Sequence, residues 1–417
     1  MFVEQVTNLG KQAKNVSADL AILGSDEKNN ALLAIAKGLK DKTPEIIEAN
    51  QKDMENGKQQ GLSASFLERL FLDEQRILGM VEGLEELVTL EDPVGTVEKM
   101  VRRPNGLDIG QLRVPLGVVA IIYESRPNVT IEAAALCLKT GNAVILRGGS
   151  ESIETNKILV DVIREALVNV GISADAVQLI ASTEREAVQV LMKLSDYIDV
   201  LIPRGGAGLI KSVRDNSSIP VLETGMGNCH IYVDQDATID AAVPIVLNAK
   251  VQRPSVCNAV ETLLVHEDIA TKFLPLVSEE LLKNKVELRA CERGLDLIPQ
   301  AVPAKDEDWD TEYLDLILAI KVVSSFDEAV AHINQHGTSH SEVILTNDYN
   351  RSRAFLEQVD AAAVYINASS RFTDGFQFGL GAELGISTQK LHARGPMGLE
   401  ALTTLKYIIY GDNQIRE

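Results

Sequence analysis

Between residues 130 and 235, strand-like apolar runs alternate with segments of helix length. The runs at 142–149, 176–182, 198–206 and 219–225 are rich in Val, Ile and Leu, and the segments between them carry apolar residues at helical spacing. Continuous apolar strands separated by helices are typical of a parallel sheet that is covered on both faces. The pattern therefore predicts an α/β fold built from βαβ units.

The flanking regions extend this pattern. Residues 1–90 show helical periodicity, and 96–123 reads as a hairpin with an Asn-Gly turn that runs into a buried strand. Alternation resumes after residue 229 with a predicted helix at 238–252 and a strand at 259–267. The tail, 405–417, is strand-like and is expected to pair either with the hairpin or with another subunit.

Composition narrows the range of partners. A formal net charge of −20 repels nucleic acid and anionic membrane surfaces, so neither is an expected partner. The longest apolar runs are strand-sized, and the N-terminus reads as a helix rather than a signal peptide. The four cysteines are scattered without a paired spacing, which predicts a reducing, cytoplasmic location.

Two predicted strands end in double glycine, at "LRGGS" (146–150) and "PRGGAG" (203–208). Glycine lets a phosphate approach the backbone, the following helix N-terminus favours an anion, and arginine adds positive charge. The alternative is a pair of tight turns, since neither loop is a GxGxxG. The candidate cofactor-binding residues here are Arg147, Gly148, Gly149, Ser150, Arg204, Gly205 and Gly206.

Cys257 lies in the polar loop "QRPSVCN", beside Arg253 and ahead of a predicted strand. A loop position near a cation is where nucleophilic thiols are found, whereas an ordinary cysteine is a small buried apolar residue. Glu223 follows a predicted strand, and its carboxylate is either solvated or a base near such a thiol.

The stretch "AVAHINQHGTSHSE" (329–342) contains three histidines. His332 and His336 are four residues apart, as metal ligands on one helix face are, but Gly337 is expected to end the helix and to leave His340 in a loop. A polar loop that receives an anion is the favoured interpretation, a solvated helix end is the alternative, and no metal is predicted.

Taken in order, the segments resemble the aldehyde dehydrogenase superfamily nearly from end to end. The resemblance rests on "RVPLGVVAIIYESRPNVTIEAAALCLKTGNAVILRGGSES", "VQRPSVCNAVETLLVH" and "NASSRFTDGFQFGLGAELGIST". The "AVAHINQHGTSHSEVI" element resembles the acyl-phosphate reductase branch of that superfamily, which acts in proline biosynthesis.

This resemblance implies an activity. The expected reaction is the NADPH-dependent reduction of L-glutamyl 5-phosphate to L-glutamate 5-semialdehyde and phosphate, through a thioester on Cys257. It also implies a homo-oligomer and glutamate 5-kinase as a possible partner that supplies the substrate. Two alternatives stay open: an oxidative aldehyde dehydrogenase that hydrolyses its thioester with Glu223 as base, and a catalytically inactive scaffold.

The resemblance also implies roles for individual residues. Ser125, Asn128 or the Cys257 N–H is expected to stabilise the oxyanion. Arg147 and Ser150 stand where NAD-preferring relatives carry a lysine and a glutamate, so they are expected to accept the 2′-phosphate of NADPH. Glu312 matches the glutamate that holds the nicotinamide ribose. The residues expected to bind the charged substrate are Arg126, His336, Gly337, Thr338, His340 and Arg371.

The implied fold has three parts. A Rossmann-like cofactor domain is expected over 1–98 and 115–228, and an α/β catalytic domain over 229–404. A small β oligomerisation element is expected over 99–114 and 405–417.

Overall fold

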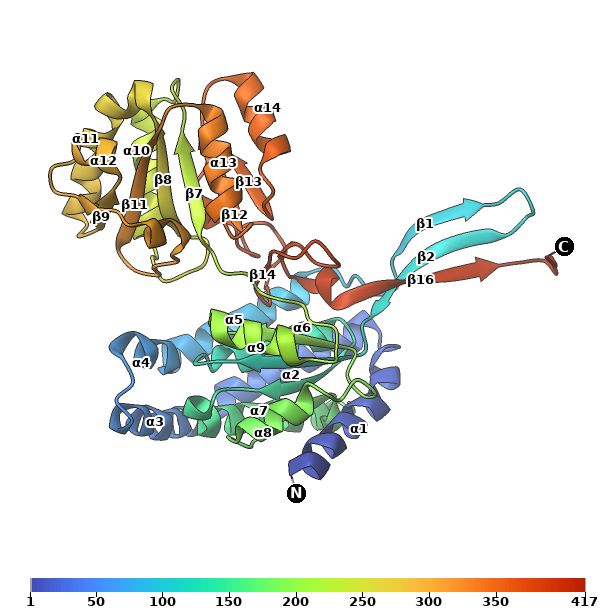
Figure 1. Cartoon of the computed structure of the whole chain (residues 1–417). Helices are drawn as coiled ribbons and strands as arrows, with labels where there is room; N and C mark the ends of the chain where they lie inside the picture. The colour runs from blue at the N-terminus through green and yellow to red at the C-terminus, as the bar shows by residue number, and fades with distance from the viewer. Residues whose placement is uncertain (1, 417) are drawn as a thin grey trace. The chain divides into compact units, whose positions relative to one another are not determined.

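The computed structural model describes residues 2–416 and divides into two compact units (Figure 1). The first unit comprises Met1–Glu223, Gly379–Gly385 and Met397–Glu417, and the second comprises Thr224–Phe378 and Ile386–Pro396. Residues 1 and 417, at the ends of the predicted domains, lie outside the described range. The assignment of the predicted domains to cofactor binding, catalysis and oligomerisation stays a prediction.

The first unit is built on a four-stranded parallel sheet in the order β5–β4–β3–β6. Its strands are β3 (Val118–Tyr123), β4 (Ala143–Arg147), β5 (Val177–Leu179) and β6 (Val200–Arg204). Every side chain of β3 is buried, as expected for a strand without polar alternation. The predicted helix-rich N-terminus and the predicted βαβ alternation up to residue 216 are confirmed.

Helices fill the predicted helix-rich N-terminus and alternate with the strands of this unit. They are α1 (Phe2–Leu20), α2 (Ser25–Asp41), α3 (Thr43–Gln59), α4 (Ala64–Leu70), α5 (Glu74–Thr89), α6 (Asn128–Lys139), α7 (Ile153–Asn169), α8 (Arg185–Leu191) and α9 (Ala207–Asn216). Short 3-10 helices lie at Ser150–Ser152, Ala174–Ala176 and Leu399–Leu402.

The prediction of a strand at 219–225 is wrong. The segment forms only an isolated parallel bridge between Val221 and Leu201. Pro220 has no N–H to donate, so the ladder cannot extend on the amino-terminal side of this bridge.

The predicted hairpin is present and pairs with the C-terminal strand (Figure 1). β1 (Val97–Arg102) and β2 (Asp108–Pro115) are antiparallel, and Gly106 in their turn has φ 88°. β16 (Thr403–Tyr410) is antiparallel to β2 along its whole length. The chain therefore provides the tail's partner itself, which is one of the two predicted alternatives.

The second unit contains a seven-stranded parallel sheet in the order β10–β9–β11–β8–β7–β12–β13. The strands are β7 (Cys229–Val233), β8 (Val260–His266), β9 (Glu287–Ala290), β10 (Val302–Pro303), β11 (Ile317–Val323), β12 (Ser341–Leu345) and β13 (Ala363–Ile366). Two further short strands, β14 (Ile386–Ser387) and β15 (Gly395–Pro396), pair with each other.

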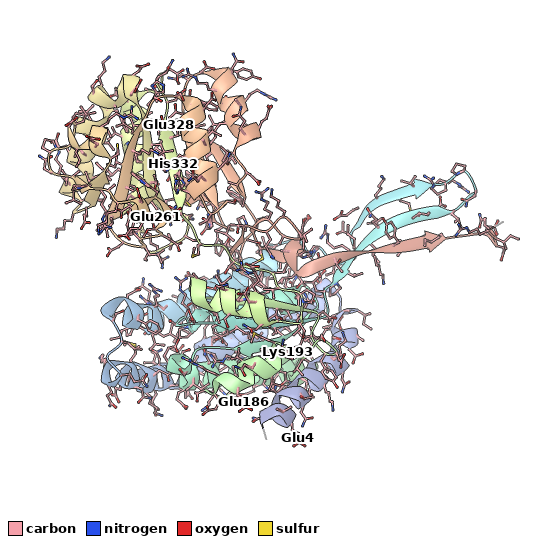
Figure 2. The ribbon with its side chains drawn as sticks, in the orientation of Figure 1. Glu4, Glu186, Lys193, Glu261, Glu328 and His332 are labelled. Carbon is pink, nitrogen blue, oxygen red and sulfur yellow. The ribbon has the colours of Figure 1, made fainter. Side chains whose placement is uncertain are left out.

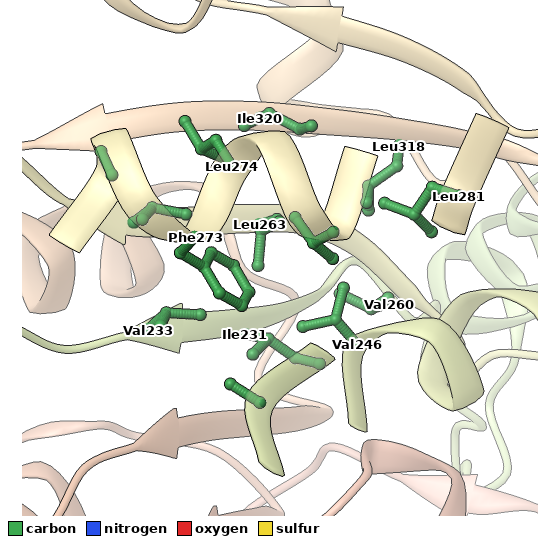
Figure 3. Packing of buried hydrophobic residues seen from close by; sticks show 14 of the residues in the cluster. Ile231, Val233, Val246, Val260, Leu263, Phe273, Leu274, Leu281, Leu318 and Ile320 are labelled. Atoms are coloured by element: carbon green, nitrogen blue, oxygen red, sulfur yellow. The ribbon is translucent and has the colours of Figure 1, made fainter. Parts of the chain in front are cut away.

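Helices cover both faces of this sheet. They are α10 (Ile239–Val251), α11 (Glu267–Lys283), α12 (Glu292–Leu295), α13 (Phe326–His336) and α14 (Tyr349–Gln358), with 3-10 turns at Asp306–Asp310 and Ser370–Phe372. Successive residues of β7 face opposite sides, so Ile231 and Val233 pack in one core with Phe273 of α11 (Figure 3). Tyr232 packs in the core on the other face. Burial on both faces fixes the register of the strands.

Over residues 2–416, none of the helices combines the length and the apolar character that crossing a membrane requires.

Candidate active site

In the first unit, three neighbouring parallel strands end at the same edge of the sheet. β3 leads to Ser125, β4 leads to Gly148, and β6 leads to Gly205. The two predicted glycine turns therefore flank the end of β3 at the carboxyl edge of the sheet, where open α/β sheets bind ligands.

Gly148 and Gly149 leave no room for side chains. A Cβ on Gly148 would lie 2.1 Å from Asn156 Nδ2, and one on Gly149 would lie 2.0 Å from a carboxylate oxygen of Glu151. The Asn156 amide is held in place because Nδ2 donates to Ser152 Oγ. Bare backbone is thus required at Gly148, which a Cβ would press against Asn156 and the ring of Tyr123, as a phosphate-binding turn requires.

Arg147 occupies the last position of β4. Its guanidinium donates to the carbonyl of Thr183 at 3.4 Å, and its Nε is buried without a hydrogen-bond partner among the described residues. Burial lowers the pKa of Arg147, and the nearby Glu151 opposes that shift. An arginine that retains an unpartnered N–H is suited to receive a further anion.

Glu124 occupies the second glycine turn, and sequence reasoning missed it. Its Oε2 accepts the N–H of Gly206, the N-cap of α9, at 3.0 Å, and the Glu124 N–H donates to the carbonyl of Arg204. A carboxylate at a helix N-terminus occupies a position that a phosphate also favours. The position of Glu124 directly after β3 was the sequence feature that could have indicated a place at this site.

The other predicted residues of the first unit already have protein partners. Ser125 is buried, has φ 49°, and donates its N–H to Glu151 Oε1. Asn128, the first residue of α6, donates from Nδ2 to Glu132 Oε1. The Arg126 carbonyl accepts the N–H of Val129, and the Glu223 carboxylate lies 3.5 Å from the Arg214 guanidinium. Ser150, in the first glycine turn, is exposed.

In the second unit the candidate residues gather at the opposite end of the strands. Cys257 precedes β8, Glu312 precedes β11, and the 336–340 segment precedes β12. Parallel pairing places these amino ends along one edge of the sheet.

Cys257 lies in the turn between α10 and β8 and is half-buried. Cys137 and Cys229 are fully buried, and burial raises the pKa of both thiols. Cys291 is half-buried but follows β9, at the other end of the sheet, where its Sγ accepts the N–H of Val322. Only Cys257 therefore combines partial exposure with a position among the other candidate residues.

Arg371 contacts both ends of the cysteine turn. Its Nε donates to Gln252 Oε1 at 2.8 Å, and its guanidinium also contacts Asn258 Oδ1. Burial lowers the pKa of Arg371, and the charge of Arg253 adds to that shift. The predicted substrate arginine therefore lies beside the candidate nucleophile.

Glu312 is fixed by the segment that leads into β7. Its Oε1 accepts the Gly227 N–H at 2.7 Å; burial raises the pKa of the Glu312 carboxyl, and this hydrogen bond opposes the rise. A Cβ on Gly227 would lie 1.5 Å from the Cys257 carbonyl oxygen. The glycine thus allows one segment to contact both the predicted cofactor carboxylate and the cysteine turn.

The histidine segment contacts the protein's own groups. His336 ends α13 and bonds through Nδ1 to Asp310 Oδ1 at 2.7 Å, and Gly337 is the C-cap of that helix, as predicted. Thr338 Oγ1 donates to the Met226 carbonyl. His340 is buried, and burial lowers its pKa to about 4, so it is neutral at pH 7.

No group of three acidic, histidine or cysteine side chains within residues 2–416 is arranged to hold a metal ion. His332 is buried on α13 (Figure 2) and packs edge-on against His230 and Trp309. Burial lowers its pKa to about 2, which indicates a neutral packing role.

Comparisons with known proteins define the class first. The sequence model described as "Aldehyde dehydrogenase family" matches residues 3–301 and 297–408. A solved acetylating aldehyde dehydrogenase from Geobacillus thermoglucosidasius, 17% identical, covers 100% of this chain and 98% of its own with a TM-score of 0.72, which supports the fold alone.

Closer relatives define the particular branch. A gamma-glutamyl phosphate reductase from Carboxydothermus hydrogenoformans is 60% identical over 99% of this chain and 100% of its own length. A crystal structure of gamma-glutamyl phosphate reductase from Thermotoga maritima is 50% identical, covers 99% of this chain and 100% of its own, and has a TM-score of 0.97. The chain therefore belongs to the aldehyde dehydrogenase family and, within it, to the gamma-glutamyl phosphate reductases. The predicted family and α/β fold are confirmed.

Proposed function

We propose that the chain catalyses the NADPH-dependent reduction of L-glutamyl 5-phosphate to L-glutamate 5-semialdehyde and phosphate, the second step of proline biosynthesis. The observation that carries the proposal is the setting of Cys257. It is a half-buried thiol in a turn whose two ends contact Arg371. A thiol beside a cation is suited to covalent catalysis on an anionic acyl compound.

The residues of the first unit fit a dinucleotide phosphate. Gly148 and Gly149 form a turn that a Cβ would fill, and the buried Nε of Arg147 lacks a partner among the described residues. Arg147 and Ser150 would hold the 2′-phosphate, and Glu312 the nicotinamide ribose. The turn at Arg204, Gly205 and Gly206 would hold the pyrophosphate once the Glu124 carboxylate leaves the Gly206 N–H. When bound, NADPH supplies a hydride, the two electrons that convert a thioester to an aldehyde.

The chain's own residues carry the acyl transfer. The Cys257 thiolate attacks the acyl carbon, the carbon–oxygen bond to phosphate breaks, and phosphate leaves with the electron pair. Arg126 and Arg371, with the 336–340 segment, are assigned to the substrate's charged groups. Ser125, Asn128 or the Cys257 N–H donates to the oxyanion. After reduction the carbon–sulfur bond breaks and the thiolate is regenerated.

Phosphate dependence in the reverse direction tests this proposal. With L-glutamate 5-semialdehyde and NADP, turnover is expected to require inorganic phosphate as the acyl acceptor, with arsenate as a substitute. Oxidation to free glutamate at the same rate without phosphate would contradict the proposal and favour a hydrolytic aldehyde dehydrogenase with Glu223 as base.

Cofactor preference tests a separate part of the proposal. NADPH is expected to give the higher kcat/KM because no carboxylate stands at position 150 to repel a 2′-phosphate. Equal or better use of NADH would contradict the roles of Arg147 and Ser150 without affecting that of Cys257.

The three-stranded arm formed by β1, β2 and β16 is proposed as the oligomerisation element. It exposes apolar side chains on its edge strands, including Met100, Tyr407 and Ile409. Exposed apolar strands are stabilised by pairing with a second copy. We also assign a cytoplasmic location, since a reducing compartment keeps a catalytic thiol active, and glutamate 5-kinase as the source of the substrate.

A further inference from the structure

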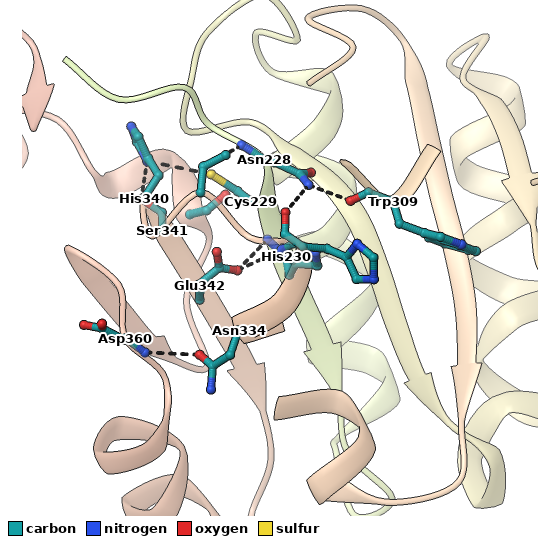
Figure 4. A network of polar contacts seen from close by, with 12 residues as sticks. Asn228, Cys229, His230, Trp309, Asn334, His340, Ser341, Glu342 and Asp360 are labelled. Atoms are coloured by element: carbon teal, nitrogen blue, oxygen red, sulfur yellow. Dashed lines mark hydrogen bonds and ion pairs between the residues drawn. The ribbon is translucent and has the colours of Figure 1, made fainter. Parts of the chain in front are cut away.

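We propose that Asn228 is a positioning residue that fixes the cofactor carboxylate Glu312 and the Cys257 turn at set positions relative to each other. This inference rests on the proposed roles of Glu312 and Cys257. Its own evidence is a buried hydrogen-bond network that converges on Asn228 (Figure 4).

The Asn228 side chain joins two distant segments. It is fully buried, and its Nδ2 donates to the Trp309 carbonyl at 2.7 Å and to the His336 carbonyl at 2.9 Å. Both partners are carbonyl oxygens, so the amide orientation is fixed, and an Asp in this place would lose both donors. The Oδ1 is buried without a hydrogen-bond partner among the described residues. Position 228 therefore requires a side chain with two N–H donors, and it accommodates an acceptor oxygen that has no hydrogen bond.

The backbone around Asn228 is held in the same way. Its N–H donates to Thr338 Oγ1 at 3.0 Å, and that hydroxyl donates to the Met226 carbonyl at 2.6 Å. The Thr338 side chain thus spans the segment just before β7. The 336–338 part of the histidine element consequently fixes residues 226–228.

The residues on either side of Asn228 contact the two proposed functional groups. Gly227 donates its N–H to Glu312 Oε1 at 2.7 Å, and the Cys229 thiol donates to the Cys257 carbonyl at 3.2 Å. Trp309, which accepts from the Asn228 amide, is three residues before Glu312. A shift of Asn228 would therefore move both contacts together, whereas the buried amide prevents such a shift.

The Asn228→Ala variant and a double-mutant cycle test this coupling. NADPH affinity is measured by fluorescence without substrate. Asn228→Ala is expected to weaken binding about tenfold, the size expected for residues that share one network. In a Glu312→Gln background the same change is expected to have less than a twofold effect, because the carboxylate it positions is absent. An undiminished effect in that background would overturn the inference.

Asn334→Ala is the control for the loss of a backbone anchor, with Asn334 exposed and Asn228 buried. Asn334 also joins backbone groups of separate segments, through Nδ2 to the Gln358 carbonyl and through Oδ1 to the Asp360 N–H, but it contacts neither functional group (Figure 4). It is expected to leave NADPH affinity within twofold of wild type. A loss equal to that of Asn228→Ala would show a general effect of lost anchoring and would overturn the inference.

The alkylation rate of Cys257 tests the other side of the coupling. Iodoacetamide labelling of the protein without cofactor, read on the Cys257 peptide, is expected to change several-fold in Asn228→Ala and not in Asn334→Ala. An unchanged rate overturns the inference. If Glu312→Gln alone leaves NADPH affinity unchanged, the proposed role of Glu312 fails, and this labelling result decides the inference by itself.

Thr338→Val gives a second route if Asn228→Ala does not fold. It preserves side-chain shape while removing the hydroxyl that links Asn228 to Met226. A smaller loss of NADPH affinity in the same direction, again absent in the Glu312→Gln background, is expected. Wild-type affinity in a folded Thr338→Val protein would overturn the inference.

Discussion

The two units use opposite ends of their parallel sheets. In the first unit the candidate residues follow β3, β4 and β6, whereas in the second most of them precede β7, β8, β11 and β12. Arg371 follows β13 and contacts the same edge through Gln252 and Asn258. The first edge consists of glycine turns and helix N-termini, which suit a phosphate-rich ligand. The second presents buried side-chain networks around one accessible thiol, which suit a reaction that needs a fixed nucleophile. The proposed function thus assigns binding to one unit and chemistry to the other, on similar α/β architecture.

Replacing Cys257 is expected to have the largest effect on turnover and to separate the roles of the two units most clearly. Cys257→Ala should reduce NADPH oxidation with enzymatically generated glutamyl phosphate by at least about a thousandfold, since the covalent route is lost. NADPH affinity should stay within twofold because the glycine turns are unchanged.

Cys291→Ala is the control for that variant, since Cys291 is the other half-buried cysteine. It should retain nearly full turnover. Comparable activity of Cys257→Ala and wild type would contradict the assignment of chemistry to the second unit.

Protonation of the buried His340 is expected to destabilise the second unit in acid. All 6 histidines of the chain lie in it: His230, His266, His332, His336, His340 and His392. Burial lowers the pKa of His340 from 6.5 to about 4, so the unfolded state binds the proton more tightly. The stability that His340 contributes is therefore full above pH 6.5 and is lost as the pH falls toward 4, by about 3 kcal/mol. Burial raises the pKa of Glu261 in the same unit from 4.5 to about 7, and this shift acts in the opposite direction over the same range.

The single tryptophan, Trp309, belongs to the second unit and reports its unfolding. Between pH 6.5 and 4, the urea midpoint from Trp309 fluorescence should fall more, or rise less, in the wild type than in His340→Gln. The same pH dependence in the two proteins would contradict the burial argument.

Gly148→Ala tests the comparison through the proposed binding role of the first unit. The added Cβ would meet Asn156 and the ring of Tyr123, so NADPH affinity should fall about tenfold in the folded protein while the alkylation rate of Cys257 stays unchanged. Gly208→Ala is the control, because that position in α9 opens onto free space. Equal losses in the two variants, measured by NADPH fluorescence, would contradict a specific requirement at the glycine turn.

Local patterns allowed much of this architecture to be predicted. Periodicity placed the strands and helices, and the glycine turns and the cysteine loop were recognisable as short stretches of sequence. The strand prediction at 219–225 failed because apolar content says nothing about where a ladder finds its partner, and Pro220 interrupts this one.

The networks that orient the site could not be predicted in the same way. The groups that hold Asn228 lie between 81 and 110 residues away in sequence, so no local spacing reveals them. Glu124 reads as an ordinary acidic residue until β3 and β6 are paired, which places its carboxylate at the Gly206 N–H. Tertiary pairing, rather than composition, determines these contacts.

The most direct test of the central claim is to trap the acyl-enzyme. The protein is incubated with L-glutamate 5-semialdehyde and NADP without phosphate, quenched in acid, and digested for mass spectrometry. We predict one glutamyl adduct per chain on the peptide containing Cys257, which added phosphate discharges. Turnover without an adduct on Cys257, or an adduct on another cysteine instead, would contradict the claim.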